Sequence, residues 1–204
     1  MKIICIGRNY ADHAAELKSE TPREPIVFLK PDSALLPRKQ AFVIPEFSND
    51  VHHEVELLVR INRLGKYIQP KFAHKYYNQI SLGIDFTARD LQQDLKAKGL
   101  PWEKAKSFDG AAVVGDQWLS VTDFKDLNQI EFSLLKNDKI VQEGNSSQML
   151  WKIDELIAYI SQFFTLKIGD IIFTGTPAGV GQVQPDDHLI AKIGDTTLIN
   201  LNIK

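Results

Sequence analysis

Val51-His52-His53-Glu54-Val55-Glu56-Leu57-Leu58-Val59 is an apolar run that two glutamates interrupt. Because a β-strand sends alternate side chains to opposite faces, both glutamates are expected on one face and the apolar side chains after them on the other. Two neighbouring carboxylates in an apolar run repel each other, and a divalent cation is the simplest compensation. In the alternative interpretation, Glu54 and Glu56 line the solvent-exposed face of a half-exposed strand, and the spacing alone leaves both open.

A second apolar run, Ile80-Ser81-Leu82-Gly83-Ile84-Asp85, ends in a carboxylate. Asp85 could supply a third oxygen ligand to an ion held by Glu54 and Glu56. A set of carboxylates without cysteine favours a hard ion such as Mg²⁺ or Mn²⁺, with water or substrate in the remaining positions. These residues are therefore a candidate metal site.

The residues after Asp85 predict a helix. Thr87 followed by Asp90 resembles a capping box, in the weaker aspartate form, at the start of that helix. Arg89 and Gln92 would then project from its first turns beside the predicted ligand. A carboxylate ligand with an adjacent cation and amide suits a bound anion.

The N-terminal segment predicts a buried strand over residues 2–6 and then a helix from Ala11 onward. On that helix His13 and Glu16 are at positions i and i+3 and so are neighbours on one face. A carboxylate beside an imidazole fixes its tautomer, favours its protonated form and makes it a better base. Taken alone, the same spacing also fits a solvated surface pair.

Two loops contain residue types that suit an anionic ligand. Residues 98–110 are expected to form a loop rich in aromatic and basic residues, with Lys106 just ahead of small residues. The second loop is Thr174-Gly175-Thr176-Pro177-Ala178-Gly179-Val180-Gly181, and its glycines expose backbone N–H groups that can hold a carboxylate or phosphate. It is not a Walker loop, because no Lys-Ser/Thr pair follows, and a plain tight turn is an equal alternative.

The remaining segments predict many short strands and few helices. A strand over residues 26–29 places Lys30 at its end, a hairpin spans residues 130–143, an amphipathic helix spans residues 151–164, and two strands surround Gly194. No repeat, low-complexity tract or linker separates these segments. We therefore expect a single β-rich α+β domain over residues 1–204.

The composition is that of an ordinary soluble globular protein, with 204 residues, 44% hydrophobic and 25% charged. A net charge of −2 without a long basic run gives no support for binding to nucleic acid or to an anionic membrane. The one cysteine, Cys5, lies in an apolar run and is expected to be buried and inert, which suits a reducing compartment. No targeting or membrane-spanning segment is visible, so we expect a cytoplasmic protein.

Taken together, these segments resemble the fumarylacetoacetate hydrolase superfamily, whose motifs occur here in the family's order along nearly the whole chain. The sequence is most similar to the compact subgroup of acylpyruvases and oxaloacetate decarboxylases, which consists of the catalytic domain alone. The motifs are Gly7-Arg8-Asn9-Tyr10-Ala11-Asp12-His13, Phe28-Leu29-Lys30-Pro31, His52-His53-Glu54-Val55-Glu56-Leu57, Asp85-Phe86-Thr87-Ala88-Arg89-Asp90, Lys98-Gly99-Leu100-Pro101-Trp102 with Lys106-Ser107-Phe108, and Thr174 to Gly181.

The resemblance implies a β-roll of mixed sheets, of the type found in the C-terminal domain of the hydrolase, and a homodimer. It implies that Mg²⁺ or Mn²⁺ binds to Glu54, Glu56 and Asp85. It also implies that His13 and Glu16 are a general-base dyad, carried on a lid that becomes ordered over bound substrate.

The same resemblance assigns the walls of the substrate pocket. Lys106 would neutralise charge on the substrate, and Lys30, Arg89 and Gln92 would help to line the pocket. Thr176 would offer its backbone N–H or its hydroxyl to a substrate carboxylate.

One position departs from the pattern of the larger family members. Ile6 stands seven positions before His13, where those members carry a fourth acidic ligand. Water or substrate must then complete the coordination shell, as in the compact subgroup. The separate N-terminal domain of the larger hydrolase is also missing, so fumarylacetoacetate itself is not the expected substrate.

The expected activity is hydrolysis of a C–C bond in acylpyruvate-type 2,4-dioxo acids. A small 2-oxo carboxylate would chelate the metal, Lys106 and the metal would stabilise the enolate, and His13 would activate the attacking water. The same site would serve oxaloacetate decarboxylation or tautomerisation, or an isomerase acting on 2-hydroxyhepta-2,4-diene-1,7-dioate, and the sequence does not separate these. A non-enzymatic metal-binding protein is a further alternative, but His13, Glu16 and Lys106 are all present.

Overall fold

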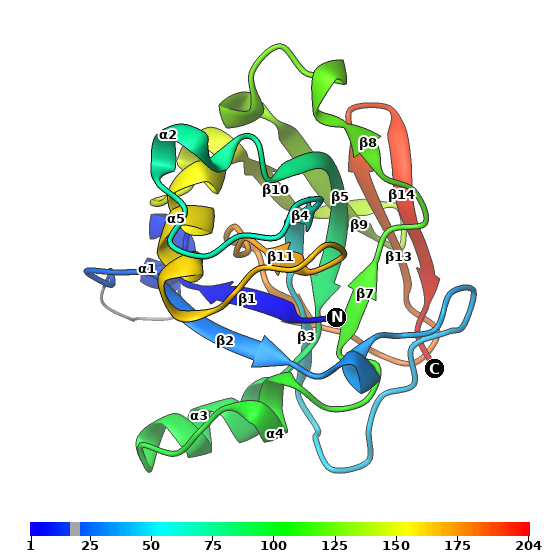
Figure 1. Ribbon diagram of the computed structural model, residues 1–204. Coiled ribbons are helices and arrows are strands. Elements are labelled where there is room, and N and C mark those ends of the chain that lie inside the picture. Colours follow the sequence, from blue (N-terminus) through cyan, green and yellow to red (C-terminus); the bar gives the residue numbers. More distant parts are fainter. Residues whose placement is uncertain (17–20) are drawn as a thin grey trace.

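The computed structural model describes residues 1–16 and 21–204, and its largest sheet is mixed (Figure 1). The strands of this sheet are β1 (Ile3–Gly7), β2 (Ile26–Lys30), β4 (Val55–Ile61), β5 (Tyr77–Asp85), β7 (Ala112–Val114), β8 (Leu119–Ser120) and β11 (Ile171–Phe173). Their order is β2-β1-β11-β4-β5-β7, with β8 also paired to β5. Strands β1 and β11 are parallel, and the other pairs are antiparallel.

Two smaller antiparallel sheets complete the strand-rich architecture. One has the order β10-β9-β13-β14 and the other the order β12-β3-β6. Their strands are β3 (Val51–His53), β6 (Thr87–Ala88), β9 (Glu131–Lys136), β10 (Lys139–Asn145), β12 (Gly181–Gln182), β13 (His188–Ile193) and β14 (Thr196–Asn202). The prediction of a β-rich α+β fold with mixed sheets is confirmed.

The helices are short and lie outside the strands (Figure 1). They are α1 (Ala11–Glu16), α2 (Pro70–Ala73), α3 (Arg89–Ala97), α4 (Glu103–Lys106) and α5 (Ile153–Phe163), with 3₁₀ turns at Asp32–Ala34, Val121–Asp123, Leu127–Gln129 and Ser146–Gln148. Helix α5 packs against α2, while α3 and α4 contact each other at another end of the molecule. Among the described residues, no helix combines the length and apolar character needed to cross a membrane.

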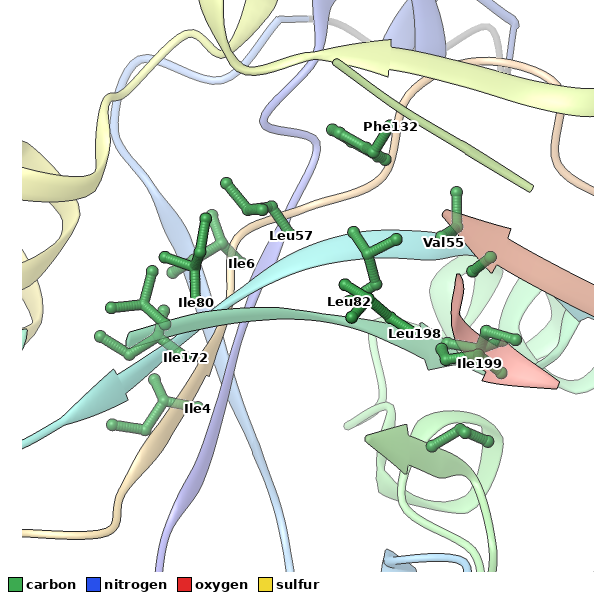
Figure 2. Packing of buried hydrophobic residues seen from close by; sticks show 14 of the residues in the cluster. Ile4, Ile6, Val55, Leu57, Ile80, Leu82, Phe132, Ile172, Leu198 and Ile199 are labelled. Carbon is green, nitrogen blue, oxygen red and sulfur yellow. The ribbon is translucent and has the colours of Figure 1, made fainter. Parts of the chain in front are cut away.

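The core explains why β4 and β5 are apolar on both faces. Leu57 and Leu82 belong to the main core cluster, which Figure 2 shows between β4, β5 and the neighbouring strands. Leu58 points the other way and packs with Cys5 and Phe173 in a second cluster. Burial of each such side chain stabilises the fold by about 1.5–3 kcal/mol. The central strands are therefore held rigidly, which fixes the polar residues at their ends.

The predicted capping box at Thr87 and Asp90 is wrong. Helix α3 begins at Arg89, and its N-cap residue, Ala88, makes no side-chain capping bond. Thr87 instead pairs with β3 as part of β6, and the Asp90 carboxylate accepts from the Ser48 hydroxyl over 2.7 Å. The pairing with β3 keeps the chain extended through Ala88, so the helix begins two residues after Thr87.

Residues 98–110 were predicted as a loop, but Glu103–Lys106 forms the helical turn α4. The backbone N–H of Lys106 donates to the carbonyl of Trp102 over 3.0 Å, which fixes where its side chain starts. The other predicted elements of regular structure are found close to their expected positions. The predicted helix from Ala11 ends, among the described residues, at Glu16, and the prediction beyond it lies partly outside them.

Candidate active site

Three buried carboxylates meet where β3, β4 and β5 come together. Glu54 lies between β3 and β4, Glu56 belongs to β4, and Asp85 is the last residue of β5. The antiparallel pairing of β4 and β5 brings them close, and the backbone N–H of Asp85 donates to the carbonyl of Glu54 over 2.9 Å. One carboxylate oxygen of each residue lies within 4.8 Å of the others.

The prediction of one continuous strand through both glutamates is wrong at Glu54. Strand β3 pairs with β6 and β12, whereas β4 pairs with β5 and β11, so the chain changes sheets at this residue. Further along β4 the side chains do alternate between the two faces of the sheet. Leu57 packs in the main core cluster and Leu58 in the second cluster. The alternative of a solvent-exposed face is also wrong, since Glu54 is 4% exposed and Glu56 2%.

The carboxylate cluster fits a hard divalent ion. Such ions bind oxygen ligands at about 2.0–2.6 Å, so three oxygens this close can share one ion. The buried Oδ1 of Asp85 receives no hydrogen bond, although the ammonium group of Lys30 lies 2.7 Å away. A carboxylate oxygen that is held only by this ion pair still has a lone pair with which to bind a metal. Ile6, at the position where larger family members have an acidic residue, is buried and lines the same pocket.

Three buried cations surround the carboxylates. Lys106 donates to Glu54 and to Asp85, each over 2.8 Å, and to the Thr87 hydroxyl over 2.7 Å. Lys30 lies beside Asp85, and its ammonium group donates to the backbone carbonyl of Lys106. Arg89 forms an ion pair with the second carboxylate oxygen of Glu54. The cluster therefore contains as many cations as carboxylates.

The pKa values of the two glutamates are shifted in opposite directions. Burial alone would raise the pKa of Glu54, but the charges of Lys106 and Arg89 outweigh burial and hold that pKa below its usual value. Burial, reinforced by the charge of Asp85, raises the pKa of Glu56 well above its usual value. Glu54 forms ion pairs with Arg89 and Lys106, whereas Glu56 forms no ion pair with any of the described residues. Glu56 instead accepts a hydrogen bond from Gly175 N–H over 2.6 Å. Of the two, Glu56 has the greater need of a further positive charge.

The predicted dyad lies on α1. His13 is buried, and its Nδ1 lies 3.2 Å from a carboxylate oxygen of Glu16. When Nδ1–H donates to Glu16, Nε2 carries the lone pair of a base. Glu16 in turn accepts from the backbone N–H of Gly179 at 3.1 and 3.3 Å. The hydrogen bond from Gly179 therefore connects the dyad to the loop after β11.

The expectation that Glu16 favours the protonated imidazole is confirmed for that contact, but burial of His13 outweighs it. Burial lowers the pKa of His13 below its ordinary value, although the Glu54 charge and the hydrogen bond to Glu16 act in the opposite direction. Burial dominates because it removes water from the charged form. A neutral imidazole near pH 7 is the form that a general base requires.

The loop from Thr174 to Gly181 brings backbone donors to the site. Gly175 has a φ of +102°, and a Cβ there would lie 2.7 Å from the Cβ of Asn9, so only glycine fits without displacement. The Thr176 hydroxyl donates to the carbonyl of Val55 over 2.8 Å. Of the two donors expected from Thr176, the backbone N–H is therefore the one available to a substrate.

A cavity of about 30 Å³ lies against these groups and has room for little more than water. The predicted pocket residues Arg89, Gln92 and Thr176 line it, and so do His13 and Lys106. Lys30 lies behind Asp85 instead and is absent from the wall. Five further wall residues had no role assigned from the sequence, and these are Gly7, Arg8, Phe28, Lys96 and Trp102.

Asn9 is a site residue that the sequence analysis did not single out. Its side chain donates to the carbonyl of Thr174 over 2.8 Å and accepts from Trp151 N–H over 2.9 Å. It thereby joins the start of α1 to the loop after β11. Its presence in the motif Gly7 to His13 was the available signal, but its partners are too distant in sequence to predict from a local pattern.

The chain is similar to known proteins of one family. The family model described as fumarylacetoacetate hydrolase C-terminal matches residues 2–203. The mitochondrial oxaloacetate tautomerase FAHD1 of Bos taurus is 40% identical over 191 residues, which cover 94% of this chain and 86% of the relative. The mitochondrial oxaloacetate decarboxylase of Dictyostelium discoideum is 43% identical over 198 residues, which cover 97% of this chain and 89% of that relative.

One similar solved structure contains a metal. Fumarylpyruvate hydrolase from Pseudomonas aeruginosa, in complex with Mn²⁺ and pyruvate, superposes with a TM-score of 0.93 at 31% identity. The alignment covers 100% of this chain and 89% of that one. Similarity of this extent covers every element that contributes to the carboxylate cluster.

Proposed function

This chain belongs to the fumarylacetoacetate hydrolase family, and we propose that it is a divalent-metal-dependent enzyme that acts on small 2-oxo carboxylates through their enolates. The main support is that a cluster of three buried carboxylates borders the same pocket as His13, whose Nδ1 lies 3.2 Å from Glu16. Metal-binding and general-base groups are thereby available to the same bound molecule.

The charges at the site favour an anionic substrate. When all three carboxylates are ionised, as metal binding requires, they face three buried cations, Lys30, Lys106 and Arg89. A divalent ion would add two positive charges to this buried cluster, and uncompensated buried charge is unfavourable. A substrate with two negative charges would restore neutrality. A 2-oxo dicarboxylate such as oxaloacetate, or an acylpyruvate as its enolate, meets this requirement.

A bound divalent ion would supply a Lewis acid that polarises the keto group of the substrate. Glu54, Glu56 and Asp85 would hold it, and both Mg²⁺ and Mn²⁺ suit an all-oxygen set. The Mn²⁺ complex of the similar hydrolase supports this class of ion.

For an acylpyruvate, we assign the proton transfers to the dyad. Nε2 of His13 takes a proton from the water that attacks the distal carbonyl, and the Glu16 carboxylate stabilises the imidazolium. The bond between C3 and that carbonyl breaks, and its electron pair remains on the pyruvate enolate. Lys106 offsets the negative charge, and the imidazolium returns its proton to C3. The products are a carboxylic acid and pyruvate.

Oxaloacetate chemistry is the second candidate, and the names of the relatives with 40% and 43% identity favour it. Tautomerisation moves one proton between C3 and the enol oxygen, which the His13–Glu16 pair can do without an attacking water. Decarboxylation needs the same stabilised enolate. An isomerase of the 2-hydroxyhepta-2,4-diene-1,7-dioate type would also need only a proton transfer, from the enol oxygen to C5 of the diene.

The test uses protein freed of metal by chelation and then supplied with Mg²⁺ or Mn²⁺. Turnover of acetylpyruvate and of oxaloacetate is followed by ultraviolet absorbance, beside the E56Q variant. Metal-dependent turnover of either substrate, lost in E56Q, supports the proposal, and the faster substrate decides between the two candidates. If Mn²⁺ binds but neither absorbance trace changes, both candidates are wrong, and an isomerase or a non-enzymatic metal-binding protein is favoured instead.

Two predictions from the sequence stay predictions. A homodimer is to be tested by light scattering of the purified protein, and a cytoplasmic location by fractionation of cells. The buried thiol of Cys5 is compatible with a reducing compartment.

A further inference from the structure

We propose that Gln142 is a positioning residue, which holds the loop from Thr174 to Gly181 in the conformation that aligns both a metal ligand and the general-base dyad. Gln142 lies on β10, outside the pocket wall, and does not touch the reacting atoms. The inference rests on the proposed function, because the groups it aligns are the metal ligand and the base assigned there.

All four hydrogen-bonding positions of the Gln142 amide are used. Its oxygen accepts from the backbone N–H of Val55 and from His53 Nδ1, each over 3.0 Å. Its nitrogen donates to the Thr176 hydroxyl over 2.9 Å and to the Pro177 carbonyl over 3.0 Å. One buried side chain, 1% exposed, thus connects the first residue of β4 to the middle of the loop.

The orientation of the amide follows from its neighbours. A backbone N–H can only donate, so the group facing Val55 must be the oxygen. The NH₂ group is then directed at the loop, where the Pro177 carbonyl can only accept. Neither partner can exchange roles, and a flipped amide would lose both bonds.

The loop that Gln142 holds carries two functional hydrogen bonds, one on each side of Pro177. Gly175 N–H donates to the predicted metal ligand Glu56 over 2.6 Å. Gly179 N–H donates to Glu16 of the dyad over 3.1 Å. The same short segment therefore sets the position of a carboxylate on β4 and of a carboxylate on α1.

This segment needs an external support. Residues 174–180 form neither helix nor strand, and the glycines at 175 and 179 have φ values of +102° and +95°. Glycine permits these conformations but does not favour them over others, so local preference alone does not fix the loop. The amide of Gln142 supplies the missing constraint at the midpoint.

A β-bulge directs Gln142 to this place. The pairing of β10 with β9 shifts register between Ile140 and Gln142, so Val141 is the extra residue. Bulges re-aim side chains and often occur beside active sites. The carbonyl of Val141 also lies 2.3 Å from where a Cβ on Gly179 would be, so the bulge and the loop fit closely.

The first test compares wild type with Q142E and the control S161A. Glutamate keeps the size and the acceptor of residue 142 but loses both donations to the loop. Ser161 is equally buried and makes two hydrogen bonds, of 2.8 and 2.9 Å, within and beside α5, away from the site. The measurements are the Kd of Mn²⁺ by electron paramagnetic resonance, kcat and KM separately, and Tm.

We expect Q142E to weaken Mn²⁺ binding and to lower kcat by about 10–100-fold, the usual effect of losing a group that orients a metal ligand. KM should change less than kcat, because Gln142 does not contact substrate. S161A should lower Tm while leaving the Kd and kcat within about twofold, since both bonds are remote from the site. Should Q142E not fold, Q142N, which keeps the amide on a shorter side chain, takes its place with smaller losses in the same direction.

A folded variant at residue 142 with wild-type Mn²⁺ affinity and wild-type kcat would overturn the inference, even with a lowered Tm. The failure of the proposed function is distinguishable from this result. If wild type turns over neither acetylpyruvate nor oxaloacetate, both candidates for the proposed function fail, and the Mn²⁺ affinities of wild type, Q142E and S161A still decide whether Gln142 positions the ligand.

Discussion

The ammonium group of Lys106 donates a hydrogen bond of 2.8 Å to a carboxylate oxygen of Asp85, so a buried cation lies directly against a predicted metal ligand. The same ammonium group donates to Glu54 over 2.8 Å. Because of these ion pairs, burial does not prevail, and the pKa of Lys106 is raised above its usual value. The lysine and a divalent ion would therefore compensate the charge of the same two carboxylates.

Replacing Lys106 by methionine should destabilise the protein most when metal is absent. Removing one partner of a buried ion pair costs about 3–5 kcal/mol, because the remaining charges are left uncompensated. A divalent ion offsets part of this loss, so Mn²⁺ should raise the Tm of K106M more than that of wild type. Thermal unfolding with chelator and with Mn²⁺ measures the difference.

The exposed pair Lys98–Asp94, of 2.7 Å, provides the control. Both side chains are 59% exposed, and such pairs contribute about 0–1 kcal/mol. K98M should therefore have a Tm close to wild type in both conditions. Equal Mn²⁺-induced shifts in K106M and wild type would contradict the shared-charge interpretation.

Replacing His13 by alanine should remove most turnover and leave metal binding intact. General-base assistance contributes about 10²–10⁴-fold, and His13 donates to the dyad partner rather than to any predicted ligand. The kcat of H13A should fall by that factor, with a Kd for Mn²⁺ within about threefold of wild type. The exposed His74 supplies the control variant H74A, whose kcat should not change. If H13A retains turnover, the dyad assignment is wrong.

The buried imidazole of His53 should make stability depend on pH. Burial lowers the pKa of His53 to about 4, and the hydrogen bond to Gln142 only partly opposes this. At a pH between the folded and the unfolded pKa of His53, the unfolded chain binds a proton at this imidazole and the folded protein does not. Lowering the pH through this range therefore stabilises the unfolded chain. The free energy of unfolding should therefore fall as the pH drops from about 6.5, the unfolded pKa, to about 4, by about 3 kcal/mol in total.

Urea unfolding of metal-free wild type and H53Q between pH 8 and pH 4 checks this prediction. Glutamine does not titrate in this range, and its amide can still donate to Gln142. The difference in unfolding free energy between the two proteins should be constant above the unfolded pKa and shift in favour of H53Q below it. A constant difference across the whole range would show that His53 does not carry the effect.

Much of the fold was predictable because its signals are local. The hairpin of β9 and β10 and the helix α5 follow from alternation and helical spacing within single segments. The carboxylate cluster was predictable as a candidate because Glu54 and Glu56 are two positions apart and Asp85 ends the strand paired with β4.

What could not be predicted depends on contacts between distant segments. The capping box at Thr87 failed because β6 pairs with β3, which no pattern around residue 87 reveals. Gln142 drew no attention because its partner Thr176 is 34 positions away. The direction of the pKa shift of His13 also depends on burial by the whole pocket rather than on Glu16 alone.

Replacing Gly179 by alanine should lower activity because of the contacts of this residue with Val141 and Glu16, and not through backbone strain alone. Gly179 has a φ of +95°, and a Cβ would approach the Val141 carbonyl to 2.3 Å, so alanine must displace the loop and its N–H from Glu16. Gly169 has a similar φ of +88° with nothing within 4 Å of its Cβ position. Both G179A and G169A are expected to lose about 1 kcal/mol through backbone strain.

Only G179A should also lose turnover, because only there does the displaced backbone orient the dyad. We expect its kcat to fall at least tenfold, which corresponds to about 1.4 kcal/mol in the barrier, while G169A keeps wild-type kcat. Steady-state kinetics of the two variants at equal Mn²⁺ saturation makes the comparison, with Tm as the check on strain. If both variants lose kcat equally, backbone strain explains the effect, and the contact between Gly179 and Glu16 has no separate role in catalysis.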